Sequence, residues 1–194
     1  GLLHCATCDV NGHMGFSLVG QVTRKDEATI RSICEAVREY LKTGSIYRGK
    51  AIKIRFRDDA GDKLPMCAIS FLDTDSIDPT QLIYSRSVEQ SIETNLFTPI
   101  RRVSDIMANN MPVKRGILLG GTYGTGKTLA AHVASKIAVE AKITYLYVPR
   151  ADELSDAIEF AKQYQSPACV VFCEDVDRVT QGERSTAMDD ILNI

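Results

Sequence analysis

The sequence carries little net charge and has no long apolar run. Its 194 residues include 23 basic and 25 acidic side chains, for a formal net charge of -2. This balance provides no overall positive field that would draw the protein onto nucleic acid. No stretch approaches the roughly 18 to 20 apolar residues of a membrane span, and the first residues lack the regions of a signal peptide. We therefore expect a cytoplasmic protein without membrane contacts, and nucleic acid is disfavoured as a partner.

The cysteines lack the repeated pairs of a disulfide framework or a zinc module. All six lie at irregular positions, which favours free thiols in a reducing compartment. Cys5 and Cys8 form one C-x-x-C pair with His4 and His13 nearby, but the sequence shows no second ligand pair at zinc spacing. We favour cysteines within a strand and keep a zinc site as the alternative.

The remaining composition is that of an ordinary globular chain. It is 44% hydrophobic and 25% charged, which suits one sizeable core or two small ones. The chain opens at Gly1, and its last letters, MDDILNI, read as an amphipathic helix without a stop signal. We therefore expect a fragment of a longer protein.

The first part of the chain reads as a small α+β domain. Asn11-Gly12 between two apolar segments predicts a β-hairpin. Residues 23–44 predict an amphipathic helix. Two further strands are expected, within residues 50–59 and 67–73. The apolar face of the helix comprises Ile30, Ile33, Val37, Tyr40 and Leu41.

The strand within 50–59 alternates apolar and basic residues. This pattern places Ile52, Ile54 and Phe56 on one side of the strand. Its basic side chains are mixed in the sequence with three nearby aspartates. A solvated strand face is therefore favoured over a phosphate-binding stripe.

A turn-rich segment, DTDSIDPTQ at 73–81, separates this region from a different pattern. Beyond it, helical and strand patterns alternate. We therefore divide the chain into an N-terminal α+β domain at 1–78 and a second domain at 79–194.

The second region contains a glycine-rich motif between an apolar run and a helical pattern. GGTYGTGKT satisfies G-x-x-x-x-G-K-[ST] with Gly121, Gly126, Lys127 and Thr128. The preceding GILLG, residues 116–120, predicts a buried parallel strand, and the residues after the motif predict a helix. A strand, a loop and a helix in this order are the context that a phosphate-binding loop requires.

Glycines in such a loop let successive backbone N–H groups turn inward, at the positive end of a helix, and cradle phosphates. Lys127 can reach the β- and γ-phosphate oxygens, and the Thr128 hydroxyl can ligate Mg²⁺. The motif therefore predicts a nucleotide bound with Mg²⁺. The expected nucleotide-binding residues are Gly121, Thr122, Tyr123, Gly124, Thr125, Gly126, Lys127, Thr128 and Leu129.

An acidic pair follows a later apolar strand. Residues 170–173 suit a central parallel strand, and Glu174 and Asp175 follow at its C-terminal end, where open α/β sheets bind ligands. Carboxylates there can hold Mg²⁺ and orient an attacking water. We therefore expect Lys127, Glu174 and Asp175 to be catalytic, and Thr128 to share the metal with the two acids.

The rest of the second region alternates helix and strand. Residues 85–110 read as helical material interrupted near Pro99. ITYLYVP at 143–149 predicts a strand, and Phe160 and Tyr164, spaced i, i+4, predict a helix that packs against the sheet. The expected fold class is α/β, a P-loop parallel sheet flanked by helices and preceded by the small α+β domain.

These motifs resemble the AAA ATPases of the AAA+ superfamily. The resemblance extends from about Leu82 to the end, with VKRGILLGGTYGTGKTLAAHVA as the Walker A region and CVVFCEDVD as the Walker B region. It implies a homo-oligomeric, usually hexameric ring that couples Mg²⁺-dependent ATP hydrolysis to remodelling of a macromolecule. A protein substrate is favoured because no basic patch with interleaved aromatics is present in the sequence. Residues 1–78 would then recognise that substrate or an adaptor.

The resemblance also suggests where other family parts lie. Ile83 and Tyr84 fall where family members place the segment that closes over adenine. The sensor asparagine, the arginine fingers and the helical lid would follow Ile194. The aromatic-apolar-glycine pore loop of polypeptide-threading members is not found after the second strand, so threading is not supported.

The acidic pair departs from the family pattern. The family ends its Walker B motif with Asp-Glu, whereas this chain has Glu174-Asp175. The reversal changes the reach of each side chain by about one methylene, and a misplacement of about 1 Å at a reacting centre can lower the rate about a hundredfold. The alternative to an ATPase is therefore a nucleotide-binding switch or scaffold with little hydrolysis. A kinase or GTPase shares the loop, but no guanine-reading N-K-x-D motif is visible.

Overall fold

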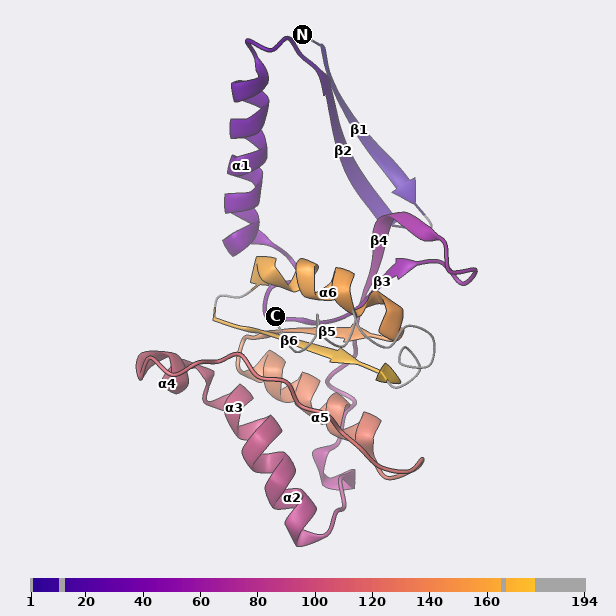
Figure 1. Cartoon of the computed structure of the whole chain (residues 1–194), viewed down its shortest axis with the longest axis vertical. Helices are drawn as coiled ribbons and strands as arrows, with labels where there is room; N and C mark the ends of the chain where they lie inside the picture. Colours follow the sequence, from indigo (N-terminus) through magenta and orange to yellow (C-terminus); the bar gives the residue numbers. More distant parts are fainter. Residues whose placement is uncertain (1, 11–12, 165–166, 177–194) are drawn as a thin grey trace, which may run out of the picture.

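The fold is built around a four-stranded mixed sheet. The computed structural model describes residues 2–10, 13–164 and 167–176. Its strands lie in the order β4-β3-β5-β6; β3 pairs antiparallel with β4 and parallel with β5, and β5 pairs parallel with β6 (Figure 1). Their bounds are Ala51–Arg57 for β3, Lys63–Phe71 for β4, Thr144–Val148 for β5 and Cys169–Cys173 for β6. The expected α/β class is confirmed, with β4 as an antiparallel addition to the parallel strands.

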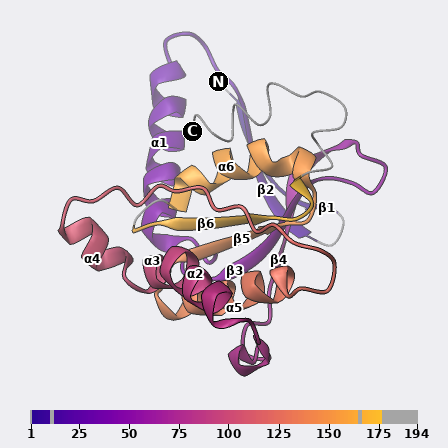
Figure 2. The ribbon, with the colours of Figure 1, turned by 60° about the horizontal axis from the view of Figure 1, so that its bottom comes forward.

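Helices cover both faces of the sheet, which gives three layers (Figures 1 and 2). One face is covered by α5 and the helices that precede it, and the other by α6. The α-helices of these layers are α2 (Arg86–Ile92), α3 (Thr98–Arg101), α4 (Val103–Ala108), α5 (Lys127–Glu140) and α6 (Leu154–Ala161). A π-helical turn, Glu93–Phe97, joins α2 to α3. Short 3-10 helices are formed by Pro79–Gln81, Ala151–Glu153 and Lys162–Tyr164. Within the described ranges, no helix is long and apolar enough to cross a membrane.

Alternation along β5 explains why both faces need a cover. Successive side chains of a strand point to opposite faces. Tyr145 joins the core cluster that contains α5 residues, whereas Leu146 and Val148 join the cluster that contains α6 residues. The Tyr145 hydroxyl donates a hydrogen bond to the Ala131 carbonyl of α5 at 2.9 Å, and burial raises the pKa of this phenol. The strand therefore ties the two helical layers together.

Leu146→Ala should lower the free energy of unfolding by about 2 to 5 kcal/mol, because it removes a fully buried side chain and leaves a cavity. Chemical denaturation followed by circular dichroism measures this change. Val88→Ala, on the exposed part of α2, is the control and should change the stability by less than about 0.5 kcal/mol. Equal effects in the two variants would contradict the core position of Leu146.

The two strands predicted within residues 50–59 and 67–73 are confirmed as β3 and β4, but they belong to the central sheet. Ile52 and Ile54 are fully buried and Phe56 packs against the same cluster, as the alternation predicted. Because β3 pairs with β5, the sheet continues across the boundary expected at 73–81. The division into two domains there stays a prediction, and it does not separate two sheets among the described strands.

Both arginines of β3 lie near acidic side chains. Arg55 contacts Asp59 at 2.8 Å, and Arg57 lies 3.9 Å from Asp152. These pairs support a mixed-charge strand face over a phosphate-binding stripe.

The predicted N-terminal β-hairpin is confirmed. β1 (Leu2–Val10) and β2 (His13–Gln21) pair antiparallel. The turn residues Asn11-Gly12 lie outside the described residues, as does the helix expected for the closing letters of the chain. Cys5 and Cys8 both lie within β1, the strand position favoured for them.

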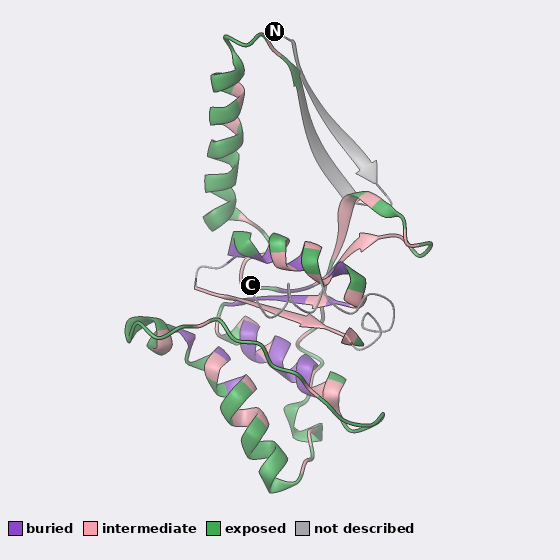
Figure 3. Cartoon of the chain, in the orientation of Figure 1, coloured by how far each residue is buried: buried purple, intermediate pink, exposed green. Residues whose placement is uncertain are grey.

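The helix predicted for residues 23–44 is α1, Glu27–Gly44. It begins after Asp26, whose carboxylate accepts a hydrogen bond from the Thr23 hydroxyl at 2.7 Å. None of its residues is buried (Figure 3), and Tyr40 on its apolar face is 68% exposed. The periodicity thus predicted the helix, while the described residues leave its apolar face uncovered.

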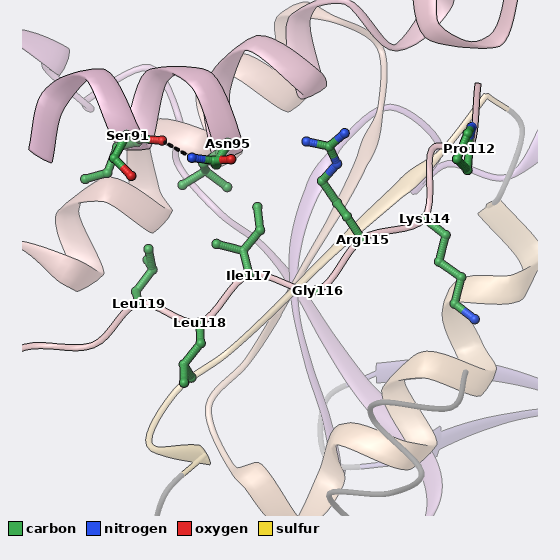
Figure 4. Close-up of a pocket in the computed structure, with 11 residues that line it drawn as sticks. Ser91, Asn95, Pro112, Lys114, Arg115, Gly116, Ile117, Leu118 and Leu119 are labelled. Atoms are coloured by element: carbon green, nitrogen blue, oxygen red, sulfur yellow. Dashed lines mark hydrogen bonds between the residues drawn. The ribbon is translucent and has the colours of Figure 1, made fainter. Parts of the chain in front are cut away.

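The prediction of a strand at residues 116–120 is wrong. These residues form no regular element, and Leu118 is 81% exposed. Among the described residues, no backbone hydrogen bond joins them to the sheet. They instead line a groove opposite Ser91 and Asn95 (Figure 4). An apolar run becomes a buried strand only where a neighbouring strand pairs with its N–H and C=O groups, and the apolar sequence does not itself supply that neighbour.

The helix continues through Pro99, where the sequence predicted an interruption. Pro99 lies in the first turn of α3, directly after the π-helical turn. Helical geometry is unbroken from residue 86 to residue 101, so Pro99 lies inside a continuous helix, directly after a π-helical turn in which the regular α-helical hydrogen bonding is already interrupted. The chain leaves helical geometry at Arg102, between α3 and α4.

Candidate functional site

The glycine-rich loop leads directly into α5. Gly124 and Gly126 have backbone φ angles of 77° and 83°, in the left-handed region that favours glycine. Gly126 is the N-cap of α5, and no described side chain caps this helix start. Because the first N–H groups of a helix have no intrahelical partner, those of Lys127, Thr128 and Leu129 can donate to a bound group.

The Lys127 side chain folds back over the loop. Its Nζ donates hydrogen bonds to the carbonyl oxygens of Gly121 and Thr122, each at 2.8 Å. Nζ also lies 5.9 Å from the centre of the Tyr123 ring, and Tyr123 is 90% exposed. The ammonium group is thus held by neutral acceptors. A phosphate could displace them, because hydrogen bonds between oppositely charged groups are stronger.

Thr128 joins the loop to the acidic pair. Its Oγ1 donates a hydrogen bond to Oε1 of Glu174 at 3.2 Å. Glu174 directly follows β6, and its N–H donates to the Val148 carbonyl at 3.2 Å, which extends the pairing of β6 with β5. The sheet therefore brings a carboxylate at the end of β6 to the first turn of α5.

Asp175 and Glu174 have different surroundings. Asp175 has a backbone φ of 48° and is exposed, whereas Glu174 is half-buried. Positive φ is uncommon outside glycine, although aspartate tolerates it better than most residues. The two acids therefore differ in exposure, and the Glu174 carboxylate accepts a hydrogen bond from Thr128 in the first turn of α5.

Tyr147 lies beside the acidic pair. It stands opposite Phe172 in the pairing of β5 and β6, and the two rings stack with their centres 5.9 Å apart. Burial, followed by the nearby Glu174 carboxylate, raises the pKa of the Tyr147 phenol to about 12. The same two causes raise the pKa of the Cys173 thiol to about 12. Both groups are therefore neutral at physiological pH and add no charge to the site.

Tyr84 contacts the loop from another part of the chain. Its hydroxyl donates a hydrogen bond to the Gly126 carbonyl at 2.7 Å. Burial raises the pKa of this phenol. Its neighbour Ile83 is 86% exposed. The segment that the resemblance associated with adenine thus touches the end of the glycine-rich loop through Tyr84.

The structure brings Thr128 of the motif into contact with Glu174 of the acidic pair, and the roles predicted for the other site residues stay predictions. Sequence reasoning missed the bond between Tyr84 and Gly126 and the place of Tyr147 beside Glu174. No local pattern encodes the first contact, since it joins residues 42 positions apart. The second could be found only once the register of β5 and β6 was known.

The oxygen atoms at this site suit a hard divalent cation. Mg²⁺ prefers oxygen ligands and is usually held by one or two protein groups together with substrate phosphates. The Thr128 hydroxyl and the Glu174 carboxylate provide two such groups side by side. Within the part of the chain that is described, no group of three or more His, Cys, Asp or Glu side chains could hold a metal ion. The Thr128 and Glu174 oxygens fit a cation that takes its remaining ligands from phosphates and water.

Comparison with known families agrees with this geometry. Residues 117–194 match the family described as ATPase family associated with various cellular activities (AAA). The match includes the glycine-rich loop, α5, β5, β6 and the acidic pair. Searches of curated proteins and of solved structures found no match. The match supports nucleotide binding of the ATPase type, and residues 117–194 are thus similar to part of an AAA-family ATPase domain.

Proposed function

We propose that the chain binds ATP at residues 121–129 and carries the residues for Mg²⁺-dependent ATP hydrolysis. The observation that carries this proposal is the 3.2 Å hydrogen bond between Thr128 and Glu174. An ordinary glycine turn between a strand and a helix has no need of an acidic partner from another strand. The family match over the same residues supports the proposal.

The loop would bind the phosphates through its backbone and Lys127. The N–H groups at the start of α5 lie at the positive end of the helix, which favours an anion. On binding, Lys127 would exchange its bonds to Gly121 and Thr122 for bonds to the β- and γ-phosphate oxygens. The other loop residues, including Tyr123, would shape the backbone around the phosphates.

We assign the binding of Mg²⁺, the metal side of the site, to Thr128 and Glu174. We assign the positioning of the attacking water to Asp175. Bound Mg²⁺ would neutralise charge on the phosphates. The direct contact between Thr128 and Glu174 supports the first assignment. The exposed Asp175 carboxylate follows at the end of β6, where it could orient a water and accept its proton. The first acid of the reversed pair would thus take the metal role, and the second the role of the family glutamate.

We further propose that the protein acts as a homo-oligomeric ring, hexameric as in the family, that remodels a protein substrate. The N-terminal region would recognise this substrate or an adaptor. The support for both statements is the family resemblance, together with a sequence that carries no basic, aromatic-rich patch for nucleic acid.

A nucleotide-binding switch with little hydrolysis is the second candidate. Asp175 favours it, because the side chain is about one methylene shorter than glutamate and its backbone φ is 48°. Tight ATP binding without measurable turnover would support the switch, and turnover would support the ATPase.

ATP binding measured with and without Mg²⁺ tests the proposed site. Isothermal titration calorimetry of the parent chain should show tighter ATP binding when Mg²⁺ is present. Thr128→Ala should reduce this gain by about tenfold, because it removes an oxygen that faces the metal side.

Ser135→Ala is the matched control for this experiment. Ser135 lies on the same helix, and its hydroxyl bonds the His132 carbonyl at 2.7 Å. The control should keep the full effect of Mg²⁺. Absence of ATP binding by the parent chain would overturn the proposed function, and an unchanged Mg²⁺ effect in Thr128→Ala would remove Thr128 from the metal side.

A further inference from the structure

We propose that Tyr84 is a positioning residue for the phosphate loop, an inference that rests on the proposed ATP site. Tyr84 lies outside residues 117–194, which match the AAA family. Its hydroxyl nevertheless donates a hydrogen bond to the carbonyl of Gly126, the last glycine of the loop, at 2.7 Å. Tyr84 acts on bound phosphate through this carbonyl.

The bond fixes the orientation of one peptide unit. The Gly126 carbonyl and the Lys127 N–H belong to the same planar trans peptide. The carbonyl also accepts the first hydrogen bond of α5, from the Ala130 N–H at 2.9 Å, so both of its lone pairs are engaged. A peptide held at its oxygen by two donors keeps its N–H directed out of the helix start, where the phosphate would bind.

Packing between Tyr84 and Gly126 reinforces this control. A Cβ atom at position 126 would lie 2.9 Å from the Tyr84 hydroxyl oxygen and 3.3 Å from the ring. Position 126 therefore requires glycine for two reasons, the contact with Tyr84 and the φ angle of 83°. The ring and the loop backbone are in direct contact, so a shift of one moves the other.

The segment that carries Tyr84 is itself anchored along α5. Lys136 Nζ donates a hydrogen bond to the Ile77 carbonyl at 2.7 Å. Leu82 packs against the core cluster that includes α5 residues. Tyr84 thus extends from a segment held by one hydrogen bond to α5 and by the packing of Leu82, which gives its hydroxyl a defined position at the helix start.

Tyr84→Phe tests the proposal because it keeps the ring and removes only the hydroxyl. We expect this variant to bind Mg-ATP about three- to tenfold more weakly, the effect of one lost hydrogen bond. Tripolyphosphate, which has no base or sugar, should lose affinity by the same factor, because Tyr84 positions the phosphate loop. Isothermal titration calorimetry measures both ligands.

Tyr145→Phe is the matched control. It removes a tyrosine hydroxyl from another carbonyl of α5, that of Ala131, with a bond of 2.9 Å. This variant should lower the melting temperature and leave the affinity for both ligands unchanged. Amide hydrogen exchange adds a readout without ligand: protection of the Ala130 N–H should fall in Tyr84→Phe and stay unchanged in Tyr145→Phe.

Each outcome separates this inference from the proposed function. A parent chain that binds neither ligand overturns both. If the parent chain and Tyr84→Phe bind ATP with equal affinity, only the role of Tyr84 is overturned. If Tyr84→Phe weakens the binding of ATP but not of tripolyphosphate, Tyr84 contacts the nucleoside. If Tyr84→Phe and Tyr145→Phe lose affinity equally, the cause is general destabilisation. Either result also overturns the positioning role.

Discussion

Lys127→Ala should weaken ATP binding by about 10- to 150-fold. Hydrogen bonds that involve a charged group contribute about 1.5 to 3 kcal/mol, and about 1.4 kcal/mol corresponds to a tenfold change in affinity. In the structure, Lys127 Nζ donates hydrogen bonds to two carbonyl groups of its own loop. The Lys127 side chain belongs to neither core cluster. The substitution should therefore reduce phosphate binding with little effect on stability. Calorimetric titration with Mg-ATP measures the change.

Lys162→Ala is the control for this prediction. Lys162 pairs with Glu159 beside α6, on the opposite face of the sheet from α5. Its removal should leave ATP affinity unchanged. An affinity for Mg-ATP in Lys127→Ala equal to that of the parent chain would rule out the proposed phosphate contact.

Asp175→Asn should lower the rate of ATP hydrolysis by about 10² to 10⁴-fold and leave ATP binding intact. The substitution keeps the size of the side chain but removes the carboxylate that would accept a proton from water. It leaves the contact between Thr128 and Glu174 in place, so the metal side should still function. Steady-state ATPase assays with Mg²⁺, over a range of chain concentrations that allows association, measure this effect.

The control and the alternative outcomes make this measurement decisive. Asp105→Asn, which removes a carboxylate paired with Arg102 at 2.8 Å on α4, should keep the parent rate. Full turnover in Asp175→Asn would move the water role to another residue. A parent chain that binds ATP but does not hydrolyse it would instead support the nucleotide-controlled switch.

Elements with a strong local pattern could be predicted from the sequence. The alternation of Ile52, Ile54 and Phe56 identified β3, and the apolar run before Glu174 identified β6. These predictions succeeded because side-chain periodicity is a local property of a strand or helix. Residues 116–120 were equally apolar but form no strand. Strand formation depends on a partner that supplies hydrogen bonds, and no local pattern contains that information.

The same distinction applies to packing. The periodicity of residues 23–44 predicted α1, yet none of its residues is buried in the structure. The strands at 51–71 were assigned to the N-terminal region, yet β3 pairs with β5 in the central sheet. An apolar face shows that a surface can be covered, whereas only the three-dimensional arrangement shows what covers it.

The sequence by itself determined the chemistry of the site. The order of glycines, Lys127 and Thr128 predicts a phosphate-binding loop, and Glu174-Asp175 supplies the acids. The tertiary structure decided which of these groups meet. The pairing of β5 and β6 places Glu174 against Thr128, and Tyr84 reaches the loop across 42 positions of sequence. Side-chain chemistry is a property of each residue, but a hydrogen bond between distant residues exists only when the fold brings donor and acceptor within about 3 Å.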